Sequence, residues 1–305
     1  MKIFDAHMHL NGGQTPDPKE LLKKFEEVDV IGACLFSIDP EDPSFTFKER
    51  MDNLFKWTDG YEGILYPVAW IHPFEDDVLN KVREAAKRGV AAFKFIPDVY
   101  HVNDEQPTKV FRLIEELGLP IFFHTGMCYD FHESAQFCNP VDWECFVKYR
   151  NIRVSIAHAG FPWCDEALHL FSKYYYNGRK LQRAVAGTET TYLGYPWIKE
   201  HMITNENGEP DYVMPELYLD TTPGPSGTFR EALFKNLISW CPNNRRVFYG
   251  SDQYADNYQL KYVKPALQRE RDLMKRLEVP ANMVEDMFQN NIKRFLGLVP
   301  RISDI

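Results

Sequence analysis

The chain has 305 residues, of which 44% are hydrophobic and 14% aromatic, so it is globular and can bury a large core. Its 35 Lys and Arg residues and 44 Asp and Glu residues give a formal net charge of −9, which argues against nucleic-acid binding and against attraction to anionic membranes. A small-molecule partner is therefore the better expectation.

No apolar stretch is long enough to cross a bilayer, and the N-terminus lacks the charged segment, apolar run and cleavage site of a signal peptide. These features predict a cytoplasmic protein. The six cysteines include no Cys-x-x-Cys pair, so we expect reduced thiols and neither a disulfide framework nor a zinc ribbon.

Eight apolar, β-rich runs follow one another along the chain. They cover residues 2–10, 30–38, 63–73, 89–97, 119–126, 152–160, 216–222 and 245–252. Amphipathic segments separate them, with apolar residues every three or four positions at 17–28, 76–89 and 108–118, and C-terminal helices are expected between about 258 and 296. This alternation predicts an α/β fold, a (β/α)₈ TIM barrel. An open doubly wound sheet has less support, because no Gly-x-Gly-x-x-Gly turn follows the first run.

The spacing between the sixth and seventh runs, about 55 residues, is longer than one crossover helix needs. It includes the aromatic and polar segment 188–212. We predict one domain over residues 1–305, with an insertion at 161–215 that forms a lid or wall over the mouth of the barrel. A peripheral decoration or an oligomer contact is the alternative reading of this insertion.

Polar side chains lie near the C-terminal ends of these otherwise apolar runs. They are His7 and His9 in the first run, His72 in the third, Lys94 in the fourth, His124 in the fifth, His158 in the sixth and Asp252 in the eighth. In a barrel the C-terminal strand ends meet at one mouth, so side chains distant in sequence come within reach of one ion. His7 and His9, two residues apart on a strand, share a face and can supply adjacent metal ligands.

The motifs FDAHMHL, AWIHP, GVAAFKF, PIFFHTG, VSIAHAG, LYLDTT, VFYGSD and NNIKRFLGL occur in this order along nearly the whole chain. Together they resemble the amidohydrolase superfamily, in particular the amidohydrolase-related branch that includes aminocarboxymuconate-semialdehyde decarboxylase. The resemblance implies one divalent metal, usually zinc, whose ligands are His7, His9, His124 and Asp252. It also implies that His158 binds a second metal or faces the substrate.

Lys94 matches the position where binuclear members of the superfamily carry a carboxylated lysine that bridges two metals. Because the branch is usually mononuclear, a second metal is the less favoured reading, and Lys94 is expected to hold a substrate carboxylate. Manganese, iron or nickel could occupy the same N/O ligand set. The resemblance also allows a homodimer.

Three imidazoles and one carboxylate leave room for a water ligand, whose pKa a divalent ion lowers from near 15.7 to about 7. Asp252 can accept the water proton and pass it to the leaving group, and His158 can polarise the substrate carbonyl. The leading hypothesis is a hydrolase that directs a metal-bound hydroxide at an amide, lactone or ester-like bond of a small anionic substrate. The alternative is a non-oxidative decarboxylase of a carboxylated aromatic or unsaturated acid, and a barrel that only binds ligands is a third reading.

Several residues have two readings. His72, Trp70 and Tyr254 are expected to contact substrate along with Lys94, and Tyr192, Trp197 and Arg230 are further candidates for the pocket. The alternative for His72, which precedes Pro73, is that it simply ends the strand, and the alternative for the aromatic residues is a place in the core. Asp5 either orients a ligand imidazole or bonds to backbone at the strand end. Asp220 either lines the pocket or bonds to the backbone of the following loop, which is the favoured reading.

Overall fold

The computed structural model describes residues 1–300 except 14, 130–131, 189–193, 224–226 and 243–244. It is an α/β fold built on a nine-stranded parallel sheet with the order β10-β9-β6-β5-β4-β3-β2-β1-β11. The strands are β1 (Ile3–His9), β2 (Val30–Phe36), β3 (Leu65–Trp70), β4 (Ala92–Phe95), β5 (Ile121–Phe123), β6 (Arg153–Ile156), β9 (Glu216–Asp220), β10 (Val247–Phe248) and β11 (Gln253–Tyr254). Each of the eight apolar runs contains a strand of this sheet, and the eighth run leads from β10 into β11.

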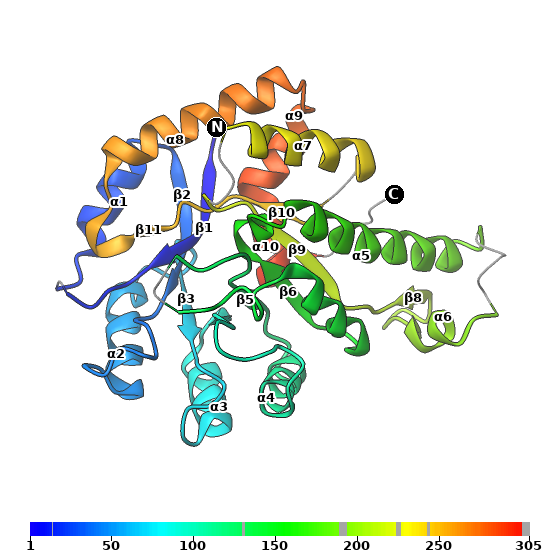
Figure 1. Ribbon diagram of the computed structural model, residues 1–305, viewed down its shortest axis with the longest axis horizontal. Coiled ribbons are helices and arrows are strands. Elements are labelled where there is room, and N and C mark those ends of the chain that lie inside the picture. Colours follow the sequence, from blue (N-terminus) through cyan, green and yellow to red (C-terminus); the bar gives the residue numbers. More distant parts are fainter. Residues whose placement is uncertain (14, 130–131, 189–193, 224–226, 243–244, 301–305) are drawn as a thin grey trace.

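The helices lie around the strands (Figure 1). They are α1 (Pro18–Glu26), α2 (Phe47–Thr58), α3 (Val78–Arg88), α4 (Glu105–Glu116), α5 (Cys164–Val185), α6 (Pro196–His201), α7 (Thr228–Trp240), α8 (Leu260–Arg276), α9 (Ala281–Glu285) and α10 (Asn291–Leu296). Shorter helical turns are η1 (Pro140–Lys148), η2 (Ala157–Gly160), η3 (Ala255–Asn257) and the π-helical η4 (Asp286–Asn290). The amphipathic spacing predicted α1, α3 and α4 correctly.

The two edge strands of the sheet belong to one short stretch of chain. β10 pairs with β9, and β11 pairs with β1 in the register Met8↔Gln253 and His9↔Tyr254. Between these pairs the Ala6 amide donates to the Tyr249 carbonyl at 3.1 Å. Residues 247–254 therefore connect the first strand of the row to the last, so the sheet is curled.

Aromatic and aliphatic side chains fill the inner side of the curled sheet. Phe122, Tyr218 and Phe248 all point there and are buried. Phe295 of α10 packs on them, with its ring centroid 4.7 Å from that of Phe122 and 5.1 Å from that of Tyr218. The C-terminal helix α10 thus packs against the strands, and the outer side of the sheet packs on the other helices.

The segment 161–215 contains α5, α6 and an antiparallel hairpin of β7 (Met202–Thr204) and β8 (Pro210–Tyr212). α5 packs against η1, β9 and α7, and β8 packs against α5. In Figure 1 the far end of α5, α6 and the hairpin project to the right of the strands. Its predicted role as a lid stays a prediction.

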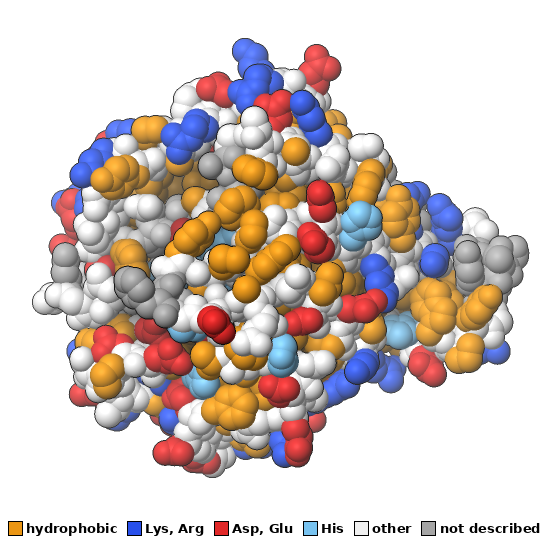
Figure 2. Space-filling view, in the orientation of Figure 1, with side chains coloured by type: hydrophobic (Ala, Val, Ile, Leu, Met, Phe, Trp, Pro, Cys, Tyr) orange, Lys and Arg blue, Asp and Glu red, His pale blue; other side chains and the backbone are white. Residues whose placement is uncertain are grey.

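None of the helices in the described part of the chain is long and apolar enough to span a bilayer. On the face drawn in Figure 2, Lys and Arg side chains lie in separate groups among acidic and apolar ones. This mixed distribution agrees with the net negative charge of the chain.

Candidate functional site

A cavity of about 220 Å³ opens where the strands end. Six of the residues singled out in the sequence line it. They are His7, His9, Lys94, His124, His158 and Asp252, joined by Ile96, Thr125, Met127, Tyr129, Phe161 and Pro223. Because parallel strands present their C-terminal ends at one edge, residues from β1, β4, β5, β6 and the segment before β11 reach one space.

Three side chains converge at one point of this cavity. The Nε2 atoms of His7 and His9 are 3.2 Å apart, and Asp252 Oδ1 lies 3.4 Å from the first and 3.2 Å from the second. One ligand atom from each residue lies within 4.8 Å of the others. This is the spacing of neighbouring corners of a metal coordination sphere, and the structure brings together three of the residues that the sequence singled out.

The tautomer of His7 supports a cation at this point. His7 Nδ1 donates to Asp220 Oδ2 at 2.6 Å, and both side chains are buried. An imidazole that carries its proton on Nδ1 presents a lone pair on Nε2, here toward His9 and Asp252. The imidazole lone pairs and the carboxylate oxygen are all electron-rich, so they repel one another unless a proton or a cation lies between them. These residues therefore fit a divalent ion.

Asp220 contacts the site in a way that its place in the sequence did not indicate. Its Oδ1 accepts from the Thr222 amide at 2.9 Å, as the favoured loop reading expected, while its Oδ2 orients the His7 imidazole. Orientation of a metal-binding histidine by a carboxylate is common in metal sites. The only signal was the position of Asp220 at the end of the seventh apolar run.

Backbone contacts place Asp252 beside β1. The Asp252 amide donates to the His7 carbonyl at 2.9 Å, and the Ser251 amide donates to Asp5 Oδ1 at 2.8 Å. A Cβ on Gly250 would lie 2.5 Å from His7 Cβ, so only glycine allows this close approach. Asp5 Oδ1 also accepts from the His7 amide at 3.3 Å, so the backbone reading of Asp5 is the one found.

His124 and His158 lie side by side, with ring centroids 4.8 Å apart, and the His158 ring centroid lies 5.6 Å from that of His7. His158 follows β6 in a left-handed conformation (φ 56°), and its amide donates to Thr222 Oγ1 at 3.2 Å. His124 Nε2 lies 3.1 Å from the Gly126 carbonyl oxygen. The ligand atom of His124 groups with Cys128 and Cys138 and not with the trio of His7, His9 and Asp252.

Burial sets the protonation states. Desolvation lowers the pKa of His7 and His124 well below the ordinary value and lowers that of His158 to about 4, so these imidazoles are neutral at pH 7. Burial would raise the pKa of Asp252, but its hydrogen bond with His9 and the nearby imidazoles outweigh it, so the pKa is lowered and the carboxylate is ionised. Burial also lowers the pKa of Lys94 to about 8.

Lys94 is 1% exposed, and its ammonium lies 5.2 Å from the ring centroid of Phe36. Within the described part of the chain it has no ion-pair partner. A buried cation that faces a cavity without a paired carboxylate is suited to bind an anionic ligand group.

The other residues predicted to contact substrate lie around His9 or away from the cavity. Trp70 and Tyr254 pack around His9, with ring centroids 5.7 Å and 5.8 Å from it. His72 is not among the cavity-lining residues, because its ring packs against Tyr100 and its Nε2 lies 3.7 Å from Glu41 Oε1. β3 ends at Trp70, and His72 begins a turn in which the Glu75 amide donates to the His72 carbonyl at 3.1 Å.

Arg230 does not face this cavity. It pairs with Glu270 at 2.6 Å and lines a separate space beside α8. Trp197 lies beside Lys180 of α5, and Tyr192 falls outside the described residues. The wall residues Met127, Tyr129, Phe161 and Pro223 lie on loops, where no periodicity marks them in the sequence.

Residues 4–187, more than half of the chain, match the family model described as Amidohydrolase. The chain belongs to the amidohydrolase family. It is an enzyme of this family, and the resemblance found in the sequence motifs is confirmed. A search of curated proteins found no match.

Solved structures share the fold of this amidohydrolase. A 5-carboxyvanillate decarboxylase from Novosphingobium aromaticivorans, with bound manganese and 3-methoxy-4-hydroxy-5-nitrobenzoic acid, has a TM-score of 0.57 at 12% identity, with 97% of each chain covered. A candidate 2-pyrone-4,6-dicarboxylic acid hydrolase from Pseudomonas putida has a TM-score of 0.55 at 12% identity, covering 98% of this chain and 99% of that one. Amidohydrolase 2 from Bifidobacterium longum subsp. infantis has a TM-score of 0.53 at 13% identity, covering 98% and 100%. At these identities the likeness concerns the fold alone.

Proposed function

We propose that this amidohydrolase is a metal-dependent hydrolase that cleaves an amide, lactone or ester-like bond in a small anionic molecule. The observation that carries the proposal is the convergence of His7 Nε2, His9 Nε2 and Asp252 Oδ1 in the cavity, with the His7 proton held on the other nitrogen by Asp220. His124, in the same cavity, is the proposed fourth ligand.

A divalent ion held by these residues supplies Lewis acidity and lowers the pKa of a water ligand to about 7. Asp252 Oδ1 faces the two imidazoles, so we assign proton transfer from water to the leaving group to Oδ2. His158, neutral and in the same cavity, donates a hydrogen bond to the substrate carbonyl oxygen.

Lys94 binds the anionic group of the substrate in this proposal. Its ammonium is buried in the cavity wall beside Phe36, so an ionic contact there is shielded from water. Trp70 and Tyr254, packed around His9, are assigned to contact the substrate beside it.

Lys94 also favours a second candidate, a non-oxidative decarboxylase. A carboxylate bound by Lys94 would place a carboxylated aromatic or unsaturated acid beside Asp252 and His158, one of which would relay a proton from water to the carbon that carbon dioxide leaves. One structure with the same fold is that of a decarboxylase with bound manganese and a substituted benzoic acid.

Zinc is our proposed ion, because imidazole and carboxylate ligands suit it, although manganese, iron and nickel also bind such sites. We propose that the curled sheet is a (β/α)₈ barrel whose eighth strand runs through β10 and β11, with residues 1–305 as one domain and 161–215 as its lid. A cytoplasmic location and a homodimer are proposed from the sequence and the resemblance.

The test begins with protein purified without chelators or a histidine tag, whose metal content is measured by elemental mass spectrometry. We expect about one divalent ion per chain, as three or four protein ligands imply. Activity is then assayed on carboxylated lactones, esters and amides and on aromatic acids, following acid release and carbon dioxide separately.

The variant Asp252→Asn should lose activity. Asp256→Asn is its control, because Asp256 accepts from the Asn11 amide and is not among the cavity-lining residues. Acid release without carbon dioxide supports the hydrolase, and carbon dioxide from the aromatic acids supports the decarboxylase. Metal-free protein with full activity, or activity retained in Asp252→Asn, would refute both.

A further inference from the structure

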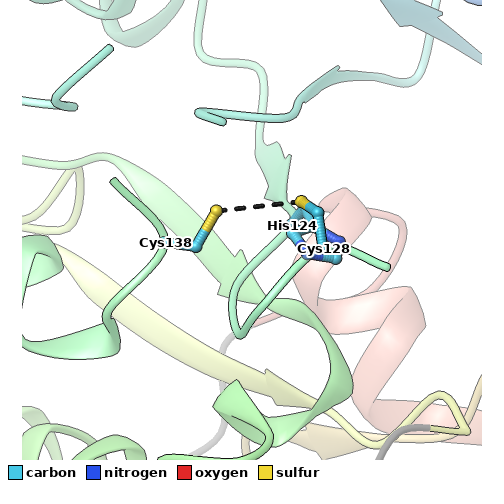
Figure 3. A group of neighbouring side chains, drawn as sticks. All are labelled: His124, Cys128 and Cys138. Atoms are coloured by element: carbon cyan, nitrogen blue, oxygen red, sulfur yellow. Dashed lines mark hydrogen bonds between the residues drawn. The ribbon is translucent and has the colours of Figure 1, made fainter. Parts of the chain in front are cut away.

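Two thiols lie beside the cavity and have no part in the proposed reaction. Cys128 Sγ and Cys138 Sγ are 3.9 Å apart, and a ring nitrogen of His124 lies within 4.8 Å of both sulfurs (Figure 3). Neither cysteine forms a disulfide. The three side chains therefore form a compact group of one imidazole and two sulfur ligands.

The loop that carries the thiols is held by its own backbone. The Gly126 amide donates to the Cys138 carbonyl at 2.9 Å, which ties the start of the loop to its end. Buried Ser134 accepts at Oγ from the Cys128 amide (3.1 Å) and at its carbonyl from the Cys138 amide (3.2 Å). Both sulfurs are thus positioned before any ligand binds.

The spacing of the sulfurs suits a shared ion better than a disulfide. Two thiolates on tetrahedral zinc, each bonded at about 2.3 Å, lie about 3.8 Å apart, close to the 3.9 Å between Cys128 and Cys138. A disulfide bond of about 2.05 Å would require the sulfurs to approach by nearly 2 Å.

We propose that His124, Cys128 and Cys138 form a second metal site, for a thiophilic divalent cation such as Zn²⁺. On binding, the two thiols release their protons to solvent, including the one that Cys138 Sγ donates to the Pro97 carbonyl at 3.3 Å. A neutral His124 that donates Nε2–H to the Gly126 carbonyl keeps its Nδ1 lone pair for the ion. Three protein ligands leave one position open to water.

This site has a consequence that rests on the proposed function. His124 is also the proposed fourth ligand of the ion at His7, His9 and Asp252, and it cannot bind two ions through one nitrogen. Zinc in excess should therefore inhibit the enzyme by drawing His124 to the thiols.

The experiment titrates Cd²⁺ into the reduced, chelator-treated full-length protein and records ultraviolet absorption. Thiolate ligands give a cadmium charge-transfer band, whereas imidazole and carboxylate ligands do not, so an ion at His7, His9 and Asp252 does not contribute. We expect a band that saturates at the absorbance of one ion bound by two thiolates per chain and is lost in Cys128→Ser and Cys138→Ser. Cys145→Ser, which removes another half-buried thiol, should keep it.

A second measurement needs no variant. Cd²⁺ should slow alkylation of half-buried Cys128 at least tenfold, read by peptide mass spectrometry, and leave half-buried Cys145 unchanged. No band, a band that persists in Cys138→Ser, or equal alkylation rates would overturn the proposal. His9→Ala should lose activity and keep the band, so failure of the thiol site and failure of the proposed function are distinguishable.

Discussion

Replacing Asp220 by asparagine tests whether a buried carboxylate sets the tautomer of His7. The amide oxygen can still accept from the Thr222 amide, but the NH₂ group replaces the oxygen that accepts from His7 Nδ1 at 2.6 Å. His7 must then lose this hydrogen bond or move its proton to Nε2. In the first case Nε2 becomes a poorer metal ligand, and in the second it has no lone pair left to bind the metal.

The expected loss of metal affinity in Asp220→Asn follows from the geometry. Loss of a partner that orients a ligand imidazole typically weakens metal binding about 10- to 100-fold, which corresponds to about 1.4 to 2.7 kcal/mol. We expect the upper end, because the contact is short and both side chains are fully buried. Zinc affinity is measured at pH 7 by competition with a chromophoric chelator.

Asp5→Asn is the matched control. Asp5 is a buried carboxylate on the same strand as His7, but it accepts from the backbone amides of His7 and Ser251 and does not touch the imidazole. Its zinc affinity should stay close to that of the wild type. The reasoning is wrong if folded Asp220→Asn binds zinc as the wild type does, or if both variants weaken binding equally.

Three further predictions concern stability. Burial lowers the pKa of Lys94 from 10.5 to about 8, so Lys94→Met should raise the free energy of unfolding in urea by up to about 3 kcal/mol at pH 7. This gain should shrink between pH 8 and 10.5, and an equal gain at pH 7 and pH 10 would contradict it. Burial lowers the pKa of His158 from 6.5 to about 4, so the unfolded chain gains a proton first and stability is lost as pH falls through this window. Between pH 7 and pH 4, the free energy of unfolding of metal-free His158→Gln should fall by about 3 kcal/mol less than that of the wild type. Equal losses in the two proteins would contradict this prediction. Gly126 (φ +87°) would place a Cβ 2.0 Å from the Phe161 carbonyl oxygen, whereas a Cβ on Gly89 (φ +96°) meets nothing within 4 Å. Thermal melts should therefore show a larger loss for Gly126→Ala than the roughly 1–2 kcal/mol expected of Gly89→Ala, and equal losses would refute the clash.

Most of the cavity could be predicted from sequence because of how parallel strands are buried. Such strands are covered on both faces and appear as nearly continuous apolar runs, so a polar residue at the end of a run stands out. His124, His158 and Asp252 were found in this way, and all three line the cavity. His72 satisfied the same pattern, yet the turn after it directs its ring toward Tyr100.

Pairing between distant residues could not be predicted. The acceptor for His7 lies 213 residues away, and a pattern that shows Asp220 at a strand end does not show which side chain it meets. Arg230 appeared available to bind an anion until the fold placed Glu270 against it. These contacts depend on which helices and strands the folded chain brings together.

The sequence by itself determined the order of strands and helices, the amidohydrolase motifs and the residues that end each strand, because periodicity and burial are local properties of a chain. Only the tertiary structure decided that Asp220 orients His7 and that His124 faces Cys128 and Cys138 as well as the cavity. The physical reason is that two residues distant in sequence meet only when the chain between them closes into a loop. The spacing of residues along the chain does not encode which loops close.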